Sequence, residues 1–299
     1  MDAPPSAQHF DLQSHSTYSD GALEPADVVR RAADAGVTLL ALTDHDTVEG
    51  VSEAIACGQD VGVTVVPAVE ISSLDDGRDP NIELHILGYL VDYTGPVLSK
   101  ALGDWIDDRR QRTLRMADGL REAGFELDDT AIKQRIEEGR SIGRVHLAEA
   151  ALKAPENAQR LAAEGIDEIG GLIRGYLIEG KAAFRLRQTP TVAEAIEVVH
   201  AAGGVAVWAH PFWDLTDPAD VLATIDRFHA LGIDGVEAFY ISHDREQTAV
   251  IVERCTELGL LTTGSADFHG PDNNLFGHFR AFDTFGFEPN LGPIAGLAG

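Results

Sequence analysis

Apolar and polar positions alternate along roughly the first ninety residues in a way that predicts strands separated by helices. Apolar runs predict strands over residues 8–13, 37–43, 63–71 and 83–91. Amphipathic segments predict helices over 24–35 and 47–58, the first with Pro25 near its start and Gly36 just after its end. Near-continuous apolar strands separated by helices are typical of a parallel sheet covered on both faces.

Residues 94–190 have a different pattern, with helical periodicity and few β-branched runs. A long helix is predicted up to Gly124, followed by two to four shorter helices interrupted by glycine and proline. We therefore expect a helical insertion or lid over residues 94–190, between barrel segments 1–93 and 191–299.

The alternation of strands and helices resumes after the insertion. Strands are predicted over 205–210, 234–241 and 260–269, and helices over 191–204, 218–232 and 243–259. About seven strand–helix units indicate an α/β protein with a closed or nearly closed (β/α) barrel. In such barrels the active site lies at the carboxyl ends of the strands.

The composition limits the kinds of partner that the protein is expected to bind and indicates its cellular compartment. The chain has 23 Lys and Arg against 49 Asp and Glu, a net charge of −26. Such a surface disfavours duplex DNA and anionic membranes, whereas a small anionic substrate remains compatible with it if metal ions lie nearby. No apolar run approaches the roughly 18–20 residues that span a bilayer, and no secretory signal is evident. Cys57 and Cys255 are far apart in the sequence, so we expect a reduced, cytoplasmic chain.

Imidazole and carboxylate side chains concentrate where the predicted strands end. Six strands carry or lead into such groups: Gln13, His15 and Asp20; Asp44, His45 and Asp46; Glu70; His85; His210; Asp267 and His269. Each group has a structural alternative, such as helix capping for the segment around His45, a salt bridge for Glu70 and a satisfied core position for His85. Six strands delivering these groups to one face favour a functional site.

The chemistry of this set indicates metal ions. Imidazoles and carboxylates without thiolates suit zinc, manganese or iron. Nine of these residues are candidate ligands: Gln13, His15, Asp20, His45, Glu70, His85, His210, Asp267 and His269. They are too many for one ion but fit two or three if Glu70 bridges, and clustered ions are typical of phosphoryl transfer.

Six segments resemble the PHP (polymerase and histidinol phosphatase) domain family, in order along nearly the whole chain. They are DLQSHSTYSDG, ALTDHDT, VEIS, HILGY, AVWAHP and GSADFHG. The insertion, including GRVHLAEAAL, is similar to that of small PHP phosphoesterases that hydrolyse nucleoside 3′,5′-bisphosphates and short RNA 5′ ends. The resemblance implies a distorted (β/α)7 barrel with a helical insertion domain, and metal-dependent hydrolysis.

The same resemblance implies particular ligand sets. One metal site would use Gln13, His15, Glu70 and Asp267; a second would share Glu70 and add His85 and His210; a third would use Asp20, His45 and His269. The cofactors would be two or three divalent ions (Mn, Zn, Fe or Mg). A hydroxide bridging two ions would be the nucleophile, with Glu70 as the bridging ligand and Asp267 as proton acceptor.

One position departs from the family pattern. The first motif of the family reads His-x-His, whereas this chain has Gln13-Ser14-His15. Because an amide oxygen is a weaker ligand than imidazole, we hypothesise that Gln13 lowers metal affinity there and biases the site towards manganese or magnesium.

Phosphate recognition needs cations beyond the metals. Candidates for contact with the substrate are Arg144, His146, Lys181 and Arg185 in the insertion, and His243 after the sixth strand. Solvated helix faces are the alternative for the insertion residues, which include Arg187. We expect the insertion to cover the strand ends and to favour a small phosphorylated substrate, a nucleotide or a short oligonucleotide end.

The predicted function is therefore a metal-dependent phosphoesterase that hydrolyses a phosphate monoester. Two alternatives stay open: a phosphatase for a metabolite such as histidinol phosphate, and a metal-binding nucleotide sensor with little turnover. The oligomeric state is not determined by the sequence.

Overall fold

The computed structural model describes residues 9–186 and 190–298. The chain divides into two compact units. Met1–Leu102 with Pro190–Gly299 form the first, here called the barrel unit, and Gly103–Thr189 form the second, the helical unit. No helix in the described ranges is both long enough and apolar enough to cross a membrane.

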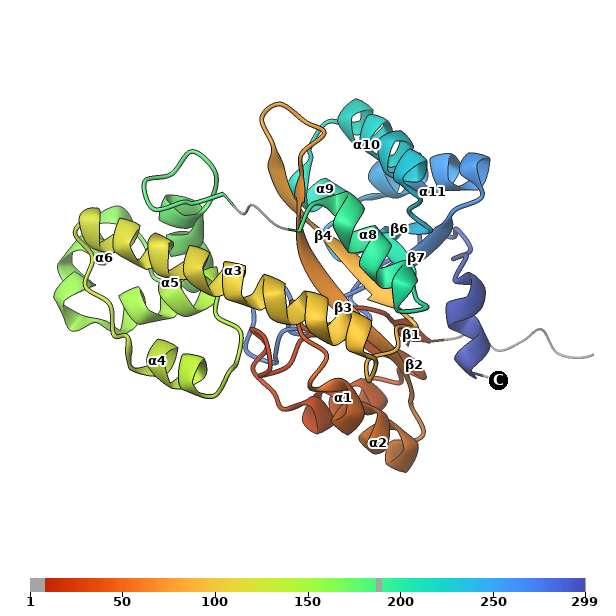
Figure 1. The fold of residues 1–299 in the computed structure, drawn as a ribbon, viewed down its shortest axis with the longest axis horizontal. Coiled ribbons are helices and arrows are strands. Elements are labelled where there is room, and N and C mark those ends of the chain that lie inside the picture. The colour runs from red at the N-terminus through yellow and green to blue at the C-terminus, as the bar shows by residue number, and fades with distance from the viewer. Residues whose placement is uncertain (1–8, 187–189, 299) are drawn as a thin grey trace, which may run out of the picture. The chain divides into compact units, whose positions relative to one another are not determined.

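The barrel unit is built on one seven-stranded sheet whose spatial order follows the chain (Figure 1). Its strands are β1 (Phe10–Asp11), β2 (Leu39–Leu42), β3 (Thr64–Asp75), β4 (Ile82–Tyr89), β5 (Val205–Trp208), β6 (Gly235–Tyr240) and β7 (Leu261–Ser265). The Leu12 N–H donates to the Gly264 carbonyl over 3.1 Å, which brings the first strand beside the last. The sheet is thus a nearly closed barrel, and the predicted α/β barrel fold is confirmed.

One strand corrects the prediction of a wholly parallel sheet. β4 is antiparallel to both β3 and β5. Only residues 76–81 connect β3 to β4, whereas a parallel crossover needs a dozen residues or more. Residues 76–81 therefore form a hairpin connection, and β3 and β4 share no intervening helix.

Helices follow most of the other strands. In the barrel unit they are α1 (Pro25–Asp34), α2 (Val51–Val61), α8 (Val192–Ala201), α9 (Pro211–Asp214), α10 (Pro218–Leu231), α11 (Arg245–Leu258) and the 3-10 segment η3 (Gly292–Ala298). α2 begins four residues later than predicted. The barrel interior is filled by apolar side chains such as Leu12, Leu39, Val66, Leu87 and Val207, all buried.

The helical unit has a core of its own. α3 (Pro96–Glu122) runs across the unit boundary and is followed by α4 (Thr130–Glu137), α5 (Arg144–Lys153), η1 (Pro155–Asn157), α6 (Ala158–Glu164), α7 (Ile169–Leu172) and the π-helical turn η2 (Ile173–Leu177). Met116, Leu120, Phe125, Ile142 and Leu147 are buried together in this unit. Apolar burial of this kind stabilises the unit from within.

Candidate metal centre

The nine predicted ligands all belong to the barrel unit, at one end of the sheet. Gln13 and His15 follow β1, His45 follows β2, and His210 follows β5. Asp267 and His269 follow β7, Glu70 lies within β3, and Asp20 lies in the loop before α1.

His85 reaches this end of the barrel by a different route. β4 runs opposite to its neighbours, so a residue in its amino-terminal half lies beside the carboxyl ends of the others. His85 is paired with Ser72 in β3, and its carbonyl accepts a 3.1 Å hydrogen bond from the Ala209 N–H. That contact sets His85 next to His210.

Three residues at the site have backbone angles that L-residues rarely adopt. The φ angles are 56° at Asp46, 33° at His210 and 52° at Asp267. Such conformations cost about 1–3 kcal/mol each and cluster at functional sites. The Asp46 N–H donates to the Glu70 carbonyl over 2.9 Å, so this loop is tied directly to the strand that carries the central carboxylate.

Glu70 is the centre of the arrangement and is almost completely buried. Its Oε2 lies 3.0 Å from His15 Nε2 and 3.6 Å from His45 Nδ1. Its Oε1 lies 2.6 Å from His85 Nδ1 and 3.3 Å from His210 Nε2. One carboxylate therefore faces four imidazoles from four different parts of the chain.

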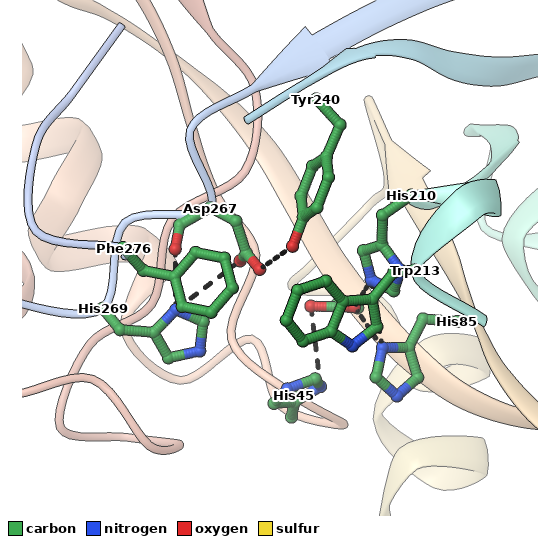
Figure 2. Close-up of a pocket in the computed structure, with 9 residues that line it drawn as sticks. His45, His85, His210, Trp213, Tyr240, Asp267, His269 and Phe276 are labelled. Carbon is green, nitrogen blue, oxygen red and sulfur yellow. Dashed lines mark hydrogen bonds and ion pairs between the residues drawn. The ribbon is translucent and has the colours of Figure 1, made fainter. Parts of the chain in front are cut away.

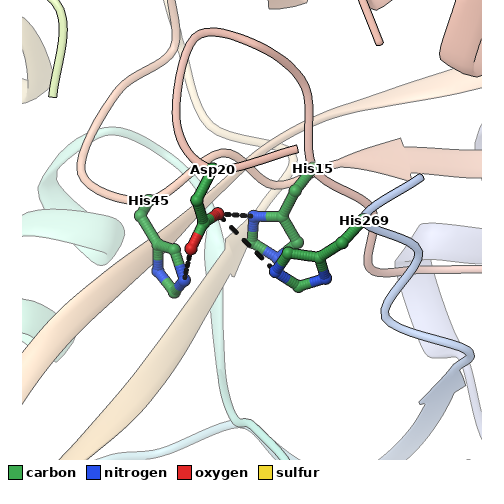
Figure 3. Close-up of side chains that lie close together, drawn as sticks. All are labelled: His15, Asp20, His45 and His269. Atoms are coloured by element: carbon green, nitrogen blue, oxygen red, sulfur yellow. Dashed lines mark ion pairs between the residues drawn. The ribbon is translucent and has the colours of Figure 1, made fainter. Parts of the chain in front are cut away.

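Asp20 lies among three imidazoles on another side of the site (Figure 3). Its Oδ1 is 3.6 Å from His15 Nδ1 and 3.6 Å from His269 Nε2, and its Oδ2 is 3.7 Å from His45 Nε2. These separations exceed hydrogen-bond length, so the groups face one another with room between them.

Asp267 connects the cluster around Glu70 with the cluster around Asp20. Its Oδ1 lies 3.1 Å from His15 Nε2 and 3.6 Å from His269 Nδ1. Its Oδ2 accepts a 2.8 Å hydrogen bond from the Tyr240 hydroxyl. Tyr240 therefore fixes the orientation of this carboxylate.

Electrostatics show that the site attracts positive charge. Burial by itself lowers the pKa of His15, but the carboxylates of Asp267 and Glu70 outweigh it and hold that pKa well above its ordinary value. His210 behaves in the same way: burial opposes protonation, yet Glu70 and Asp214 raise its pKa to about 10. For Glu70 burial raises the pKa, and the imidazoles of His45 and His85 reverse this and lower it well below the usual range.

The donor set fits divalent metal ions. Three groups each offer ligand atoms within 4.8 Å of one another: His15, Asp20, His45 and His269; His45, Glu70 and His85; His15, Glu70 and Asp267. His15 Nε2 and Asp267 Oδ1 are buried and make no hydrogen bond with another atom of the described residues. Buried polar atoms of this kind need a partner, and a shared cation would satisfy both.

These groups differ in detail from the predicted ligand sets. His45 joins Glu70 and His85 in one group, and His15 belongs to two groups. His210 Nε2 nevertheless lies 3.4 Å from His85 Nδ1 and faces the same carboxylate oxygen. The division of ligands among individual ions stays a prediction.

Gln13 presents its amide nitrogen to the centre. Its Nε2 donates to Glu70 Oε2 over 3.0 Å, and its Oε1 lies 3.4 Å from the Ser265 hydroxyl oxygen. In this arrangement the Gln13 side chain holds Glu70 in place. The amide oxygen of Gln13 would face a metal ion only if the side-chain amide flipped by 180°.

Outside the ligands, buried acids support the loops that carry them. Asp44 accepts from the Ser16 N–H over 2.7 Å and from the Ser19 hydroxyl over 2.5 Å. Glu237 accepts from the His210 N–H over 2.9 Å and from the Ser265 hydroxyl over 2.6 Å. These hydrogen bonds fix the loops after β1 and β5 and so orient His15 and His210.

The ligand residues line a pocket together with aromatic side chains (Figure 2). Its lining consists of His45, Glu70, His85, His210, Trp213, Tyr240, Asp267, His269 and Phe276, and its open volume is about 410 Å³. The sequence interpretation missed the three aromatic residues. Tyr240 ends a strand and could have been found by the strand-end rule, whereas Trp213 and Phe276 lie in connections where no pattern marks them.

The structure does not place His243 at this pocket. The residue is 5% exposed, its Nδ1 lies 3.1 Å from the Ala238 carbonyl, and its Nε2 accepts from the Phe212 N–H over 3.4 Å. Burial lowers its pKa to about 4, so the ring is neutral. Both nitrogens are engaged by the backbone, which leaves neither for a substrate.

The other four predicted substrate contacts lie in the helical unit. His146 Nδ1 accepts from the Gly143 N–H over 3.1 Å at the start of α5, and Arg144 is the first residue of that helix. Arg185 Nη1 donates to the Phe184 carbonyl over 2.8 Å, and Lys181 is exposed. Arg187 lies outside the described residues. Phosphate binding by these residues stays a prediction.

Comparison with known families identifies the family to which the chain belongs. A family model described as the PHP domain matches residues 11–179, more than half of the chain. The chain belongs to the PHP domain family. The match covers β1 to β4 and the helical unit as far as η2, and so includes the first six predicted metal ligands.

Relatives of this PHP protein resemble it over most of their length. A 5′-3′ exoribonuclease of Haemophilus influenzae is 33% identical, covering 88% of this chain and 90% of that protein. A phosphoribosyl 1,2-cyclic phosphate 1,2-diphosphodiesterase of Eggerthella lenta is 32% identical, covering 87% and 94%. A 3′,5′-nucleoside bisphosphate phosphatase of Chromobacterium violaceum is 31% identical, covering 88% of both chains.

Solved structures agree with this assignment. An amidohydrolase from Chromobacterium violaceum with bound sulfate and no metal has a TM-score of 0.81 and 29% identity, covering 97% of this chain and 96% of that one. A second solved structure, described as that of a metal-dependent phosphoesterase from Bifidobacterium adolescentis, has a TM-score of 0.75 and 26% identity, with 91% of both chains covered. The predicted enzyme class is confirmed: this PHP protein is a metal-dependent phosphoesterase.

Proposed function

We propose that this chain hydrolyses a phosphate monoester of a small nucleotide, such as a nucleoside 3′,5′-bisphosphate, or of a short oligonucleotide end. The observation that carries the proposal is the buried Glu70 facing four imidazoles, with Asp20 and Asp267 beside it, at the base of an open pocket. Two relatives, named as a nucleoside bisphosphate phosphatase and an exoribonuclease, support the nucleotide substrate.

The proposed ligands are the nine residues Gln13, His15, Asp20, His45, Glu70, His85, His210, Asp267 and His269, holding two or three ions (Mn, Zn, Fe or Mg). When bound, divalent ions would neutralise phosphate charge and lower the pKa of water, so that a hydroxide nucleophile is available near neutral pH.

The protein's own groups have distinct roles in this proposal. Glu70 gathers the imidazoles around one carboxylate, which keeps the reacting atoms in fixed positions. The Tyr240 hydroxyl donates to Oδ2 of Asp267 and orients this carboxylate, which is proposed to accept a proton from the attacking water. Arg144, His146, Lys181 and Arg185 are proposed to bind phosphate oxygens of the substrate.

The deciding experiment is inorganic phosphate release by the manganese-reconstituted protein with adenosine 3′,5′-bisphosphate, AMP and histidinol phosphate compared at equal concentration. Fast release from the bisphosphate supports the proposal. Release from histidinol phosphate alone would replace it with the metabolite phosphatase. No release from any of the three, with metal content verified, would contradict the small-nucleotide substrate and favour a sensor.

Replacing Gln13 tests its effect on metal affinity. We expect Gln13→His to raise metal affinity about tenfold or more, because imidazole is a better ligand than an amide and the position lies against Glu70. Metal content after dialysis against limiting manganese or zinc measures this, together with turnover. Gln159→His, which adds an imidazole at an exposed position, is the control. Unchanged metal content and turnover in Gln13→His would show that the hypothesis is wrong.

A further inference from the structure

One wall of the metal-lined pocket is aromatic. Of its nine lining residues, six are imidazoles or carboxylates and the other three are Trp213, Tyr240 and Phe276, here called the aromatic wall. Figure 2 shows these three rings around the carboxylate of Asp267. The pocket therefore combines groups suited to a charged phosphate with a surface suited to an uncharged, flat group.

Trp213 is the member of the wall that is open to solvent. It is 52% exposed, more than any other large apolar side chain among the described residues. Its indole meets Phe276 at 5.6 Å with the rings inclined by 61°, and Tyr240 at 6.3 Å with an inclination of 75°. Within the described ranges, no other aromatic ring stacks parallel on the indole, so its plane is available to a ligand.

The backbone holds this indole close to the metal ligands. Trp213 lies three residues after His210 in the short helix α9, and its N–H donates to the His210 carbonyl over 2.9 Å. On the other side, the His269 N–H donates to the Phe276 carbonyl over 2.9 Å. Trp213 and Phe276 are thus each tied through the backbone to a predicted ligand, and a group stacked on Trp213 lies beside the reaction site.

We infer that Trp213, supported edge-on by Phe276 and Tyr240, stacks on the base of the nucleotide whose phosphate is hydrolysed. This inference rests on the proposed function and names the group that gives it specificity. A base stacked on an aromatic side chain contributes about 1–3 kcal/mol, which corresponds to about 5-fold to 150-fold in affinity or kcat/KM. Every base has a flat face, so the wall selects nucleotides over sugar phosphates and discriminates little among the bases.

The test compares adenosine 3′,5′-bisphosphate with its abasic counterpart, methyl riboside 3,5-bisphosphate, on wild type, Trp213→Ala and Trp213→Phe. We expect the wild type to prefer the nucleotide by about 10-fold to 100-fold in kcat/KM. Trp213→Ala is expected to lose most of that preference, mainly through KM, and Trp213→Phe to retain most of it. Leu275→Ala, an exposed apolar change beside Phe276 that does not line the pocket, is the matched control and should keep the wild-type preference. An equal loss on both substrates in Trp213→Ala would overturn the inference.

A binding measurement separates this inference from the proposed reaction. Titration of metal-free protein with AMP should quench tryptophan fluorescence in the wild type and not in Trp213→Phe, because the buried Trp208 and the half-buried Trp105 are common to both. Quenching without turnover would contradict the proposed function but support stacking of the base on Trp213. Turnover of the nucleotide, with the same quenching in wild type and in Trp213→Phe, would contradict stacking on Trp213 but support the proposed function.

Discussion

Glu70→Gln is expected to lower kcat/KM for the nucleotide by about 10²-fold to 10⁴-fold and to reduce the bound metal. Glu70 Oε1 and Oε2 face imidazoles from four segments, and the shortest of these contacts is 2.6 Å, to His85. Bound metal ions stabilise the charge of the transition state by several kcal/mol, and each 1.36 kcal/mol lost is about tenfold in rate. Glutamine has nearly the same shape, so the loss reports on charge and on ligand strength.

Steady-state kinetics and metal content of the same preparation measure this effect. Glu53→Gln makes the same chemical change at an exposed position on α2 and should leave both quantities unchanged. Full metal content together with activity within tenfold of wild type would show that Glu70 is not the central ligand.

Chelation of the metals is expected to abolish phosphate release and to destabilise the protein. Three carboxylates and five imidazoles converge in a mostly buried site, so the cations bind the folded chain and not the unfolded one. A metal ion at a free concentration of about 100 times its Kd stabilises the folded state by about 2.7 kcal/mol. This corresponds to a Tm rise of about 5–10 °C in a chain of this size. Thermal unfolding and activity before chelation, after it, and after return of manganese measure both effects.

The stabilisation should also depend on pH in a defined direction. Carboxylates raise the pKa of His210 to about 10 in the metal-free protein, and a protonated imidazole cannot bind an ion. Protons therefore compete with metal at any pH below about 10, and the metal-dependent rise in Tm should shrink as the pH falls. A rise that stays constant with pH, or activity that survives complete chelation, would contradict a site built on these imidazoles.

Much of the site was predictable because its signals are local in sequence. Each barrel strand is a short apolar run followed at once by polar groups, and strands of a parallel barrel end on the same side. The sequence alone therefore places His15, His45, Glu70 and Asp267 together. Glu70 was the clearest case, since an acid in an apolar strand is costly to bury without partners.

The sequence by itself determined the order of strands and helices, the barrel and the identity of the groups at its mouth, because hydrophobic period and residue chemistry are read position by position. Only the tertiary structure decided the antiparallel course of β4, the amide orientation of Gln13 against Glu70, the burial of His243 and the aromatic wall. Each of these depends on which distant segments pack together. Trp213 and Phe276 are 63 positions apart, and no local pattern relates them until the sheet brings the ends of β5 and β7 to the same mouth.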